Sequence, residues 1–331
     1  MNRIRKVITT VNYSPDNLEI LREIFDGSEF VHVDENDTEG ILCEVKDADV
    51  AVLEADLDER FLGDNSLKWI HCNHAGLDKS AKPEVFRRGI ILTGSAGRSS
   101  PVLAEHCIYF MLCACYHSRE LMDAQRRHVW LNPPDLWNWK GLFGQTAGII
   151  GMGNTGRMLA ERLHALGMKL IAYNRSPIEG LDYIEKKLIS SRGDGLSPLL
   201  SESDFIILCI RLTNETYHLI DDHAFKQIKK GAVLINMCRG AVVDTEALVR
   251  ALDRHQIACA GLDVFEQEPL PPDSPIWDRR DVYITPHSTP AVPDRAARCL
   301  EIIRENVRRY KAGESLLNRV EEKDCFGFVT N

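Results

Sequence analysis

The sequence predicts an α/β protein of two lobes, each built on a parallel sheet with helices on its faces. Short apolar runs alternate with helical patterns along most of the 331 residues, which is typical of parallel sheets. The glycine pattern G-x-G-x-x-G occurs in the second alternating region, between residues 145 and 176. A late helical pattern follows the last predicted strand of that region, so it can return the chain to the first lobe.

The first lobe is predicted from residues 1–100, which lack phosphate-binding glycines. The strands expected there are Lys6–Val11, Phe30–Val33, Val50–Leu53, Trp69–Cys72 and Ile90–Thr93, with helical pieces over Leu18–Phe25 and Glu84–Arg88. A long helical pattern then runs from Pro101 to about Arg126, and the preceding GSAGRSS is a polar hinge candidate. Residues 128–144 carry three tryptophans and two prolines. Their composition suits a subunit contact and packing onto their own domain equally well.

Residues 145–176 are predicted to form a strand, a glycine turn, a helix and a second strand. The first strand includes Ala147 and Ile150, the helix stops near Gly167, and the second strand covers Leu170–Tyr173. This context, a unit of about 30 residues, makes the glycine pattern a specific signal for dinucleotide binding. A glycine-rich turn in another α/β fold is the alternative. The residues expected at the pyrophosphate are Gly151, Gly153, Asn154, Thr155 and Gly156.

The end of the second strand indicates which dinucleotide binds. NAD-binding units place Asp or Glu about 20 residues beyond the glycines, whereas this chain has Asn174, Arg175 and Ser176. A carboxylate would repel a 2′-phosphate, but Arg can bind one and Ser can add a donor. We therefore favour NADP over NAD as the cofactor, the alternative being that these residues form a plain polar loop.

The remaining strands and helices complete the predicted domains. The further strands are Asp204–Ile210, Ala232–Met237, Ile257–Val264 and Val282–Thr285, and the further helices are Asp244–His255 and Ala296–Lys311. We expect residues 1–100 and 290–331 to form a substrate domain and residues 101–289 to form a dinucleotide-binding domain. A small substrate would bind between two such lobes.

Three motifs directly follow predicted strands, where an open α/β sheet presents its ligand crevice. They are Asn236-Met237-Cys238-Arg239-Gly240, the run Asp263 to Leu270 (DVFEQEPL), and Thr285-Pro286-His287. Arg239 can bind a carboxylate in a bidentate manner and polarise an adjacent carbonyl. Taken singly, each motif has a simpler explanation. Arg239 suits a surface ion pair, Glu268 a solvated loop acid and His287 an ordinary loop histidine.

Together the three motifs resemble those of the D-isomer-specific 2-hydroxyacid dehydrogenases. The resemblance extends to the glycine turn, to Leu103-Ala104-Glu105-His106 and to the run Asn73 to Asp78 (NHAGLD). It implies a Rossmann doubly wound nucleotide domain beside a flavodoxin-like substrate (catalytic) domain. It also implies an NAD- or NADP-dependent enzyme that interconverts a 2-keto acid and its D-2-hydroxy acid, and a homodimer formed through the nucleotide-binding domain.

The chemistry of keto-acid reduction agrees with the roles that this resemblance implies. His287 is the general acid in reduction and the base in oxidation, while Glu268 favours the charged imidazolium and orients it. Arg239 binds the substrate carboxylate and stabilises the growing negative charge. Backbone N–H groups of His74, Ala75 and Gly76 are expected to contact the same carboxylate. Cys238 and Asp263 are assigned to the cofactor side.

Several residues depart from the family pattern. Ser288-Thr289-Pro290 follows the histidine where a short Ile/Gly or Ala sequence is expected, and Thr155 replaces an apolar residue of the glycine turn. Arg211 stands where Pro is frequent, either as a second phosphate partner or as an exposed charge. His74 is unusual in the substrate loop and would bias which acid is accepted.

Bulk properties exclude other classes of function. Lys plus Arg total 40 against 49 Asp plus Glu, and a net charge of −9 argues against nucleic acid or an anionic membrane as partner. No apolar stretch is long enough to span a membrane, and no signal peptide is evident. The ten scattered cysteines indicate reduced thiols in a cytoplasmic protein, with neither a disulfide framework nor a metal site expected.

The leading functional hypothesis is NADPH-linked reduction of glyoxylate, hydroxypyruvate or a similar small 2-keto acid. A D-3-phosphoglycerate or D-lactate type of dehydrogenase is the alternative within the same class. A dinucleotide-sensing protein, similar to the transcriptional corepressors that share this fold, is the alternative from another class, because fold alone does not decide function.

Overall fold

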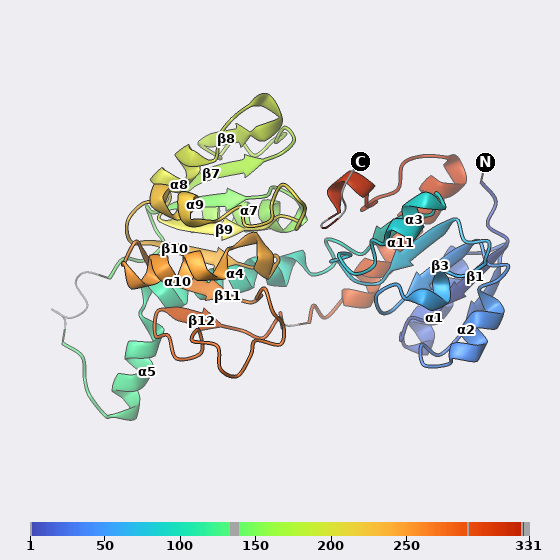
Figure 1. Ribbon diagram of the computed structural model, residues 1–331, viewed down its shortest axis with the longest axis horizontal. Helices are drawn as coiled ribbons and strands as arrows, with labels where there is room; N and C mark the ends of the chain where they lie inside the picture. Colours follow the sequence, from blue (N-terminus) through green and yellow to red (C-terminus); the bar gives the residue numbers. More distant parts are fainter. Residues whose placement is uncertain (1, 133–138, 290, 326, 328–331) are drawn as a thin grey trace. The chain divides into compact units, whose positions relative to one another are not determined.

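The chain divides into two compact units in the computed structural model, which describes residues 2–132, 139–289, 291–325 and 327. Unit 1 comprises Met1–Ser99 with Ala291–Asn331, and unit 2 comprises Ser100–Pro290. Figure 1 traces each unit along the sequence. None of the described helices has the length and apolar character needed to cross a membrane.

Unit 1 is built on a five-stranded parallel sheet. Its strands are β1 (Lys6–Thr9), β2 (Glu29–His32), β3 (Val50–Leu53), β4 (Trp69–Cys72) and β5 (Ile91–Gly94). They lie in the order β2-β1-β3-β4-β5, which is the flavodoxin-like arrangement. The prediction of a parallel flavodoxin-like sheet is confirmed, with ends of β1, β2 and β5 shifted by one or two residues.

Helices cover both faces of this sheet. They are α1 (Pro15–Ile24), α2 (Thr38–Glu44), α3 (Pro83–Arg87) and α11 (Arg295–Ala312). Along β1, Val7 packs with α1 and α11 while Ile8 packs with α2 and α3, since successive strand residues face opposite ways. The Tyr310 ring of α11 stacks on Trp69 with 5.6 Å between ring centroids. The helix α11 therefore packs within unit 1.

Unit 2 is built on a seven-stranded parallel sheet. Its strands are β6 (Thr146–Ile150), β7 (Lys169–Asn174), β8 (Lys186–Ile189), β9 (Phe205–Leu208), β10 (Ala232–Asn236), β11 (Ile257–Leu262) and β12 (Val282–Ile284). Their order, β12-β11-β10-β9-β6-β7-β8, is the doubly wound Rossmann order with one added strand. The order reverses between β6 and β9, so the expected ligand crevice lies at the carboxyl ends of these strands.

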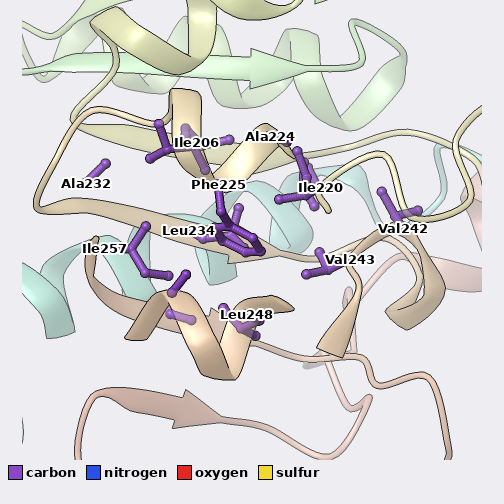
Figure 2. Packing of buried hydrophobic residues seen from close by; sticks show 14 of the residues in the cluster. Ile206, Ile220, Ala224, Phe225, Ala232, Leu234, Val242, Val243, Leu248 and Ile257 are labelled. Atoms are coloured by element: carbon purple, nitrogen blue, oxygen red, sulfur yellow. The ribbon is translucent and has the colours of Figure 1, made fainter. Parts of the chain in front are cut away.

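Two hydrophobic layers enclose the unit 2 sheet. Its helices are α4 (Ser100–Cys115), α5 (Ser118–Arg126), α7 (Asn154–Ala165), α8 (Ser197–Glu202), α9 (Asp222–Gln227) and α10 (Thr245–Asp253). Ile206 of β9 packs with α8, α9 and α10 in the layer shown in Figure 2, whereas the next residue, Ile207, packs with α4 and α7. Successive strand residues therefore enter opposite layers, as expected of a sheet covered on both faces.

Two expectations need correction. The single helix predicted from Pro101 to Arg126 is two helices, because His117 has a left-handed backbone, with φ 43°. The β8 strand was not predicted, since it carries few apolar residues. Of the aromatic segment 128–144, residues 133–138 lie outside the described residues. On its described flanks, the side chains of Trp130 and Phe143 are 91% and 84% exposed.

Candidate active site

The glycine turn joins β6 to α7 at the switch point of the unit 2 sheet. Gly151 has a φ of +100°, and a Cβ there would lie 2.4 Å from the carbonyl oxygen of Cys209. A Cβ on Gly156 would lie 2.0 Å from the carbonyl oxygen of Gly151. A Cβ on Gly153, in contrast, would meet nothing within 4 Å, and this N-cap residue of α7 gives the helix no side-chain cap. The turn thus fits a pyrophosphate, which needs open backbone at a helix N-terminus.

The end of β7 adjoins this turn. The Asn174 side chain accepts a hydrogen bond from the Met152 N–H (3.1 Å) and donates one to the carbonyl oxygen of Ser176 (2.8 Å). Arg175 and Ser176 are exposed. The carbonyl oxygen of Arg175 accepts a hydrogen bond from Ser191 N–H at 3.1 Å. The polar turn 190–192 after β8 therefore lies beside Arg175, and we missed it because β8 itself was not predicted.

The turn after β10 is closed by Asn236, which is buried. Its side-chain nitrogen donates to the carbonyl oxygen of Arg239 (2.9 Å), and its side-chain oxygen accepts from the Cys238 N–H (3.1 Å). Burial raises the pKa of the Cys238 thiol to about 12, so this thiol stays protonated. A Cβ on Gly240 would lie 1.9 Å from the carbonyl carbon of Phe265. The Arg239 turn is thereby packed against the backbone that follows β11.

Glu268 and His287, which come from the ends of two neighbouring strands, form a close pair. The His287 Nδ1 lies 2.7 Å from the Glu268 Oε2, and the Glu268 Oε1 accepts a hydrogen bond from the Phe265 N–H at 2.9 Å. The His287 side chain is 48% exposed and the Glu268 side chain is 34% exposed. Because Nδ1 is bound to the carboxylate, Nε2 is the ring atom left for proton exchange with a ligand.

The buried carboxylate of Asp263 ties the ends of β11 and β12 together. Its Oδ1 accepts hydrogen bonds from the Thr285 hydroxyl (2.6 Å) and the Ser288 N–H (3.1 Å). The Thr285 hydroxyl also lies 3.1 Å from Nε2 of His106, whose Nδ1 is 3.4 Å from the Thr289 hydroxyl. Sequence patterns assign no role to His106, although a histidine in a largely apolar helix is a visible signal.

A second histidine–glutamate pair joins Glu266, on the same strand-end loop as Glu268, to His218, in the loop that follows β9. The His218 Nε2 is 2.5 Å from the Glu266 Oε1, and the His218 ring stacks on Tyr217 with 4.0 Å between centroids. Arg211, in the loop before His218, is exposed, and its carbonyl oxygen accepts a hydrogen bond from the Thr216 hydroxyl (2.7 Å). Its role as a phosphate partner stays a prediction.

The predicted substrate loop, residues 73–76, follows β4 in unit 1. The carbonyl oxygen of His74 accepts a hydrogen bond from the Ser95 N–H (2.9 Å), and a Cβ on Gly94 would lie 2.7 Å from the same oxygen. The His74 Nε2 lies 3.4 Å from the Asp56 Oδ1, within ion-pair distance but without hydrogen-bond geometry. Ala75 is exposed at the tip. The end of β5 therefore braces this loop.

The doubly wound sheet of unit 2 with its glycine turn, together with the flavodoxin-like unit 1, defines a dinucleotide-dependent dehydrogenase. The family model for the D-isomer specific 2-hydroxyacid dehydrogenase NAD binding domain matches residues 108–289. A glyoxylate reductase from Korarchaeum cryptofilum is 33% identical over 299 residues, covering 86% of each chain. Another, from Pyrococcus horikoshii, is 32% identical over 325 residues, covering 95% of this chain and 96% of that one.

Solved structures agree with these relatives. The crystal structure of a D-isomer specific 2-hydroxyacid dehydrogenase from Xanthobacter autotrophicus, in complex with NADPH and MES, has a TM-score of 0.79 and 26% identity. The alignment covers 97% of this chain and 99% of that one. The chain belongs to the D-isomer specific 2-hydroxyacid dehydrogenase family. It is an NAD(P)-dependent oxidoreductase that interconverts a 2-keto acid and its 2-hydroxy acid by hydride transfer.

Proposed function

We propose that this protein reduces a small 2-keto acid of the glyoxylate or hydroxypyruvate type, with NADPH as its preferred cofactor. The observation that carries the proposal is the Glu268–His287 pair. The two residues follow neighbouring strands, β11 and β12, of the sheet whose glycine turn after β6 fits a pyrophosphate. The glyoxylate reductase relatives support the choice of a small substrate. A phosphoglycerate or lactate type of dehydrogenase is the alternative within the family.

His287 is the proposed proton donor. The bound cofactor supplies the hydride to the keto carbon, and negative charge develops on the keto oxygen. Protonated His287 gives its Nε2 proton to that oxygen, and in the oxidative direction the neutral ring takes the proton back. The Glu268 carboxylate, 2.7 Å from Nδ1, stabilises the imidazolium and holds the ring in one orientation. Arg239 binds the substrate carboxylate and stabilises the developing charge.

The two units are proposed to divide the binding work. Unit 2, predicted as residues 101–289, holds the dinucleotide, with Asn154 and Thr155 beside its pyrophosphate and Cys238 and Asp263 on the nicotinamide side. Unit 1, predicted as residues 1–100 and 290–331, offers the backbone of His74, Ala75 and Gly76 to the substrate carboxylate. Support for this comes from the braced 73–76 loop, whose carbonyl oxygen at His74 is held by the Ser95 N–H.

We also propose a cytoplasmic homodimer. The dimer is proposed because α4 and α5 expose large apolar side chains. Large apolar side chains are exposed on and just after these helices, namely Tyr109, Leu112, Tyr116, Leu121, Met122 and Trp130. Such a surface suits burial against a second copy of the chain. The cytoplasmic location is supported by the ten cysteines, all within the described ranges, which form no disulfide and eight of which are buried.

The preference for NADPH rests on Arg175 and Ser176, which are exposed at the end of β7 where a carboxylate would select NAD. We expect Arg175→Ala to weaken NADPH binding about tenfold or more while NADH binding changes less than twofold. Lys169→Ala is the matched control, since it removes one exposed cation from the opposite end of the same strand. An equal response of the two cofactors to Arg175→Ala would refute the 2′-phosphate argument.

The activity itself is tested by following NADPH and NADH oxidation against a panel of 2-keto acids. The panel includes glyoxylate, hydroxypyruvate, pyruvate, 3-phosphohydroxypyruvate and a branched 2-keto acid. We expect the highest kcat/KM with NADPH and one of the first two. Tight dinucleotide binding without turnover of any acid would favour the sensor function instead.

A further inference from the structure

His106 bonds to both sides of the segment that carries His287. It lies in the second turn of α4, and its ring is 3.1 Å from the Thr285 hydroxyl and 3.4 Å from the Thr289 hydroxyl. Thr285 stands two residues before His287, and Thr289 stands two residues after it. One buried ring thus connects a core helix with both flanks of the proposed proton donor.

The direction of these hydrogen bonds follows from the number of available protons. The Thr285 hydroxyl has one proton, and it donates that proton to the Asp263 carboxylate at 2.6 Å. Thr285 must therefore accept from His106, which places the ring proton on Nε2. The other ring nitrogen, Nδ1, is then an acceptor for the Thr289 hydroxyl. A neutral ring satisfies every partner. Burial lowers the pKa of His106, and this effect exceeds the opposite effect of the nearby Asp263 charge, which raises it.

The ring of His106 is itself firmly held. The residue is 6% exposed, and its ring centroid lies 4.8 Å from that of Phe110, which is fully buried between α4 and the sheet. A rigid anchor matters here because His287 has a φ of 49°, a left-handed backbone that non-glycine residues rarely adopt. Such a conformation persists only where surrounding contacts determine it. The hydrogen bond from the His287 N–H to the Asp263 carbonyl (2.8 Å) is one such contact.

We propose that His106 is a positioning residue, which sets the place of His287 by holding Thr285 and Thr289 against α4. The inference rests on the proposed role of His287 as proton donor. It also explains one departure from the family pattern, because the hydroxyl of Thr289 supplies the second hydrogen bond. His106 itself does not exchange protons with the substrate.

The first experiment compares steady-state kinetics of three variants with the wild-type enzyme. His106→Leu keeps the bulk of the ring and removes both hydrogen bonds, and we expect kcat to fall about 10- to 100-fold, since small misplacements of reacting groups have effects of this size. The Kd for NADPH should change less than twofold. His106→Gln, which retains a donor and an acceptor, should recover most of the loss. Thr289→Val, which removes the longer bond, should cost about threefold.

A matched control separates positioning from general destabilisation. Met111→Ala creates a cavity on the same helix without removing either hydrogen bond of His106, and should lower the Tm without lowering kcat at a temperature where the protein is folded. If His106→Leu and Met111→Ala reduce Tm and kcat in the same proportion, His106 is merely structural and the inference is overturned.

A double-mutant cycle gives the sharpest test. Once His287 has been replaced by Ala there is no proton donor to position, so adding His106→Leu should leave the residual rate within about twofold. An additive further loss in that background would contradict the positioning role. The proposed function is checked separately by the single variant. If His287→Ala retains full activity, the assignment of the proton donor fails, whatever His106→Leu does.

Discussion

Among the described residues of unit 2, two histidine–glutamate pairs have closely similar geometry. The Glu268–His287 pair is joined at 2.7 Å and the Glu266–His218 pair at 2.5 Å. Both histidines have a left-handed backbone, with φ values of 49° and 48°. In each pair the carboxylate is about one-third exposed, at 34% and 31%. The chemistry of a carboxylate orienting an imidazole is therefore present twice.

The pairs differ in what surrounds them. His287 follows the last strand at the carboxyl edge of the sheet, and its segment is tied to Asp263 and His106. The other carboxylate, Glu266, accepts a hydrogen bond from the Thr245 N–H (3.2 Å) at the start of α10. His218 also donates its backbone N–H to the carbonyl oxygen of Ala241 at 2.9 Å. The second pair thus links loops to one another. A histidine–glutamate pair alone does not identify the proposed acid; the position of His287 directly after a strand end does.

The largest effect on kcat is expected from His287→Ala, which removes the imidazole of the first pair. Loss of the proposed general acid should lower kcat by about 10²–10⁴-fold, with the Kd for NADPH changed less than threefold. Steady-state assays and a fluorescence titration of NADPH measure the two quantities. A parallel loss of cofactor affinity would mean that the histidine supports the dinucleotide site instead.

Arg239 extends the comparison, because its turn packs against the loop that carries both glutamates. Arg239→Lys keeps the charge but removes the planar fork that fits a carboxylate. We expect kcat/KM for the keto acid to fall about 10- to 100-fold, mostly through KM, in line with the loss of a charge-assisted hydrogen bond. Unchanged KM values across the keto-acid panel would exclude Arg239 from substrate binding.

Glu268→Gln tests the carboxylate without changing its shape. Activity in reduction should fall about tenfold, since the amide stabilises the protonated ring less well than the carboxylate does. Steady-state assays of keto-acid reduction measure this, and Glu266→Gln is the matched control, for which a much smaller loss of activity is expected.

The smallest effect is expected from His218→Ala. This change breaks the second pair and its stacking on Tyr217 but removes no group of the proposed site. We expect kcat to change less than about threefold and stability to fall by about 1 kcal/mol, the usual worth of a partly exposed hydrogen bond. Chemical unfolding and kinetics test this. A loss as large as that of His287→Ala would erase the distinction between the pairs.

Much of the fold was predictable because its signals are local. The strand, glycine turn and helix of residues 146–165 follow from apolar periodicity and from glycine's freedom to adopt positive φ, as at Gly151. The strands Val50–Leu53 and Trp69–Cys72 were predicted to the residue, since buried parallel strands are continuous apolar runs. Short or polar elements such as β8 lack that signal and were missed.

The sequence by itself determined the parallel α/β character of both units and the dinucleotide turn, and it singled out Arg239, Glu268 and His287 as the proposed site residues. The resemblance to the family already implied that Glu268 faces His287. Only the tertiary structure showed that Glu266, two residues away, lies within hydrogen-bond distance of a different histidine, His218. It alone joined His106 to Thr285 and Thr289, far apart in the chain. Strand order and packing create such contacts, and no local pattern encodes them.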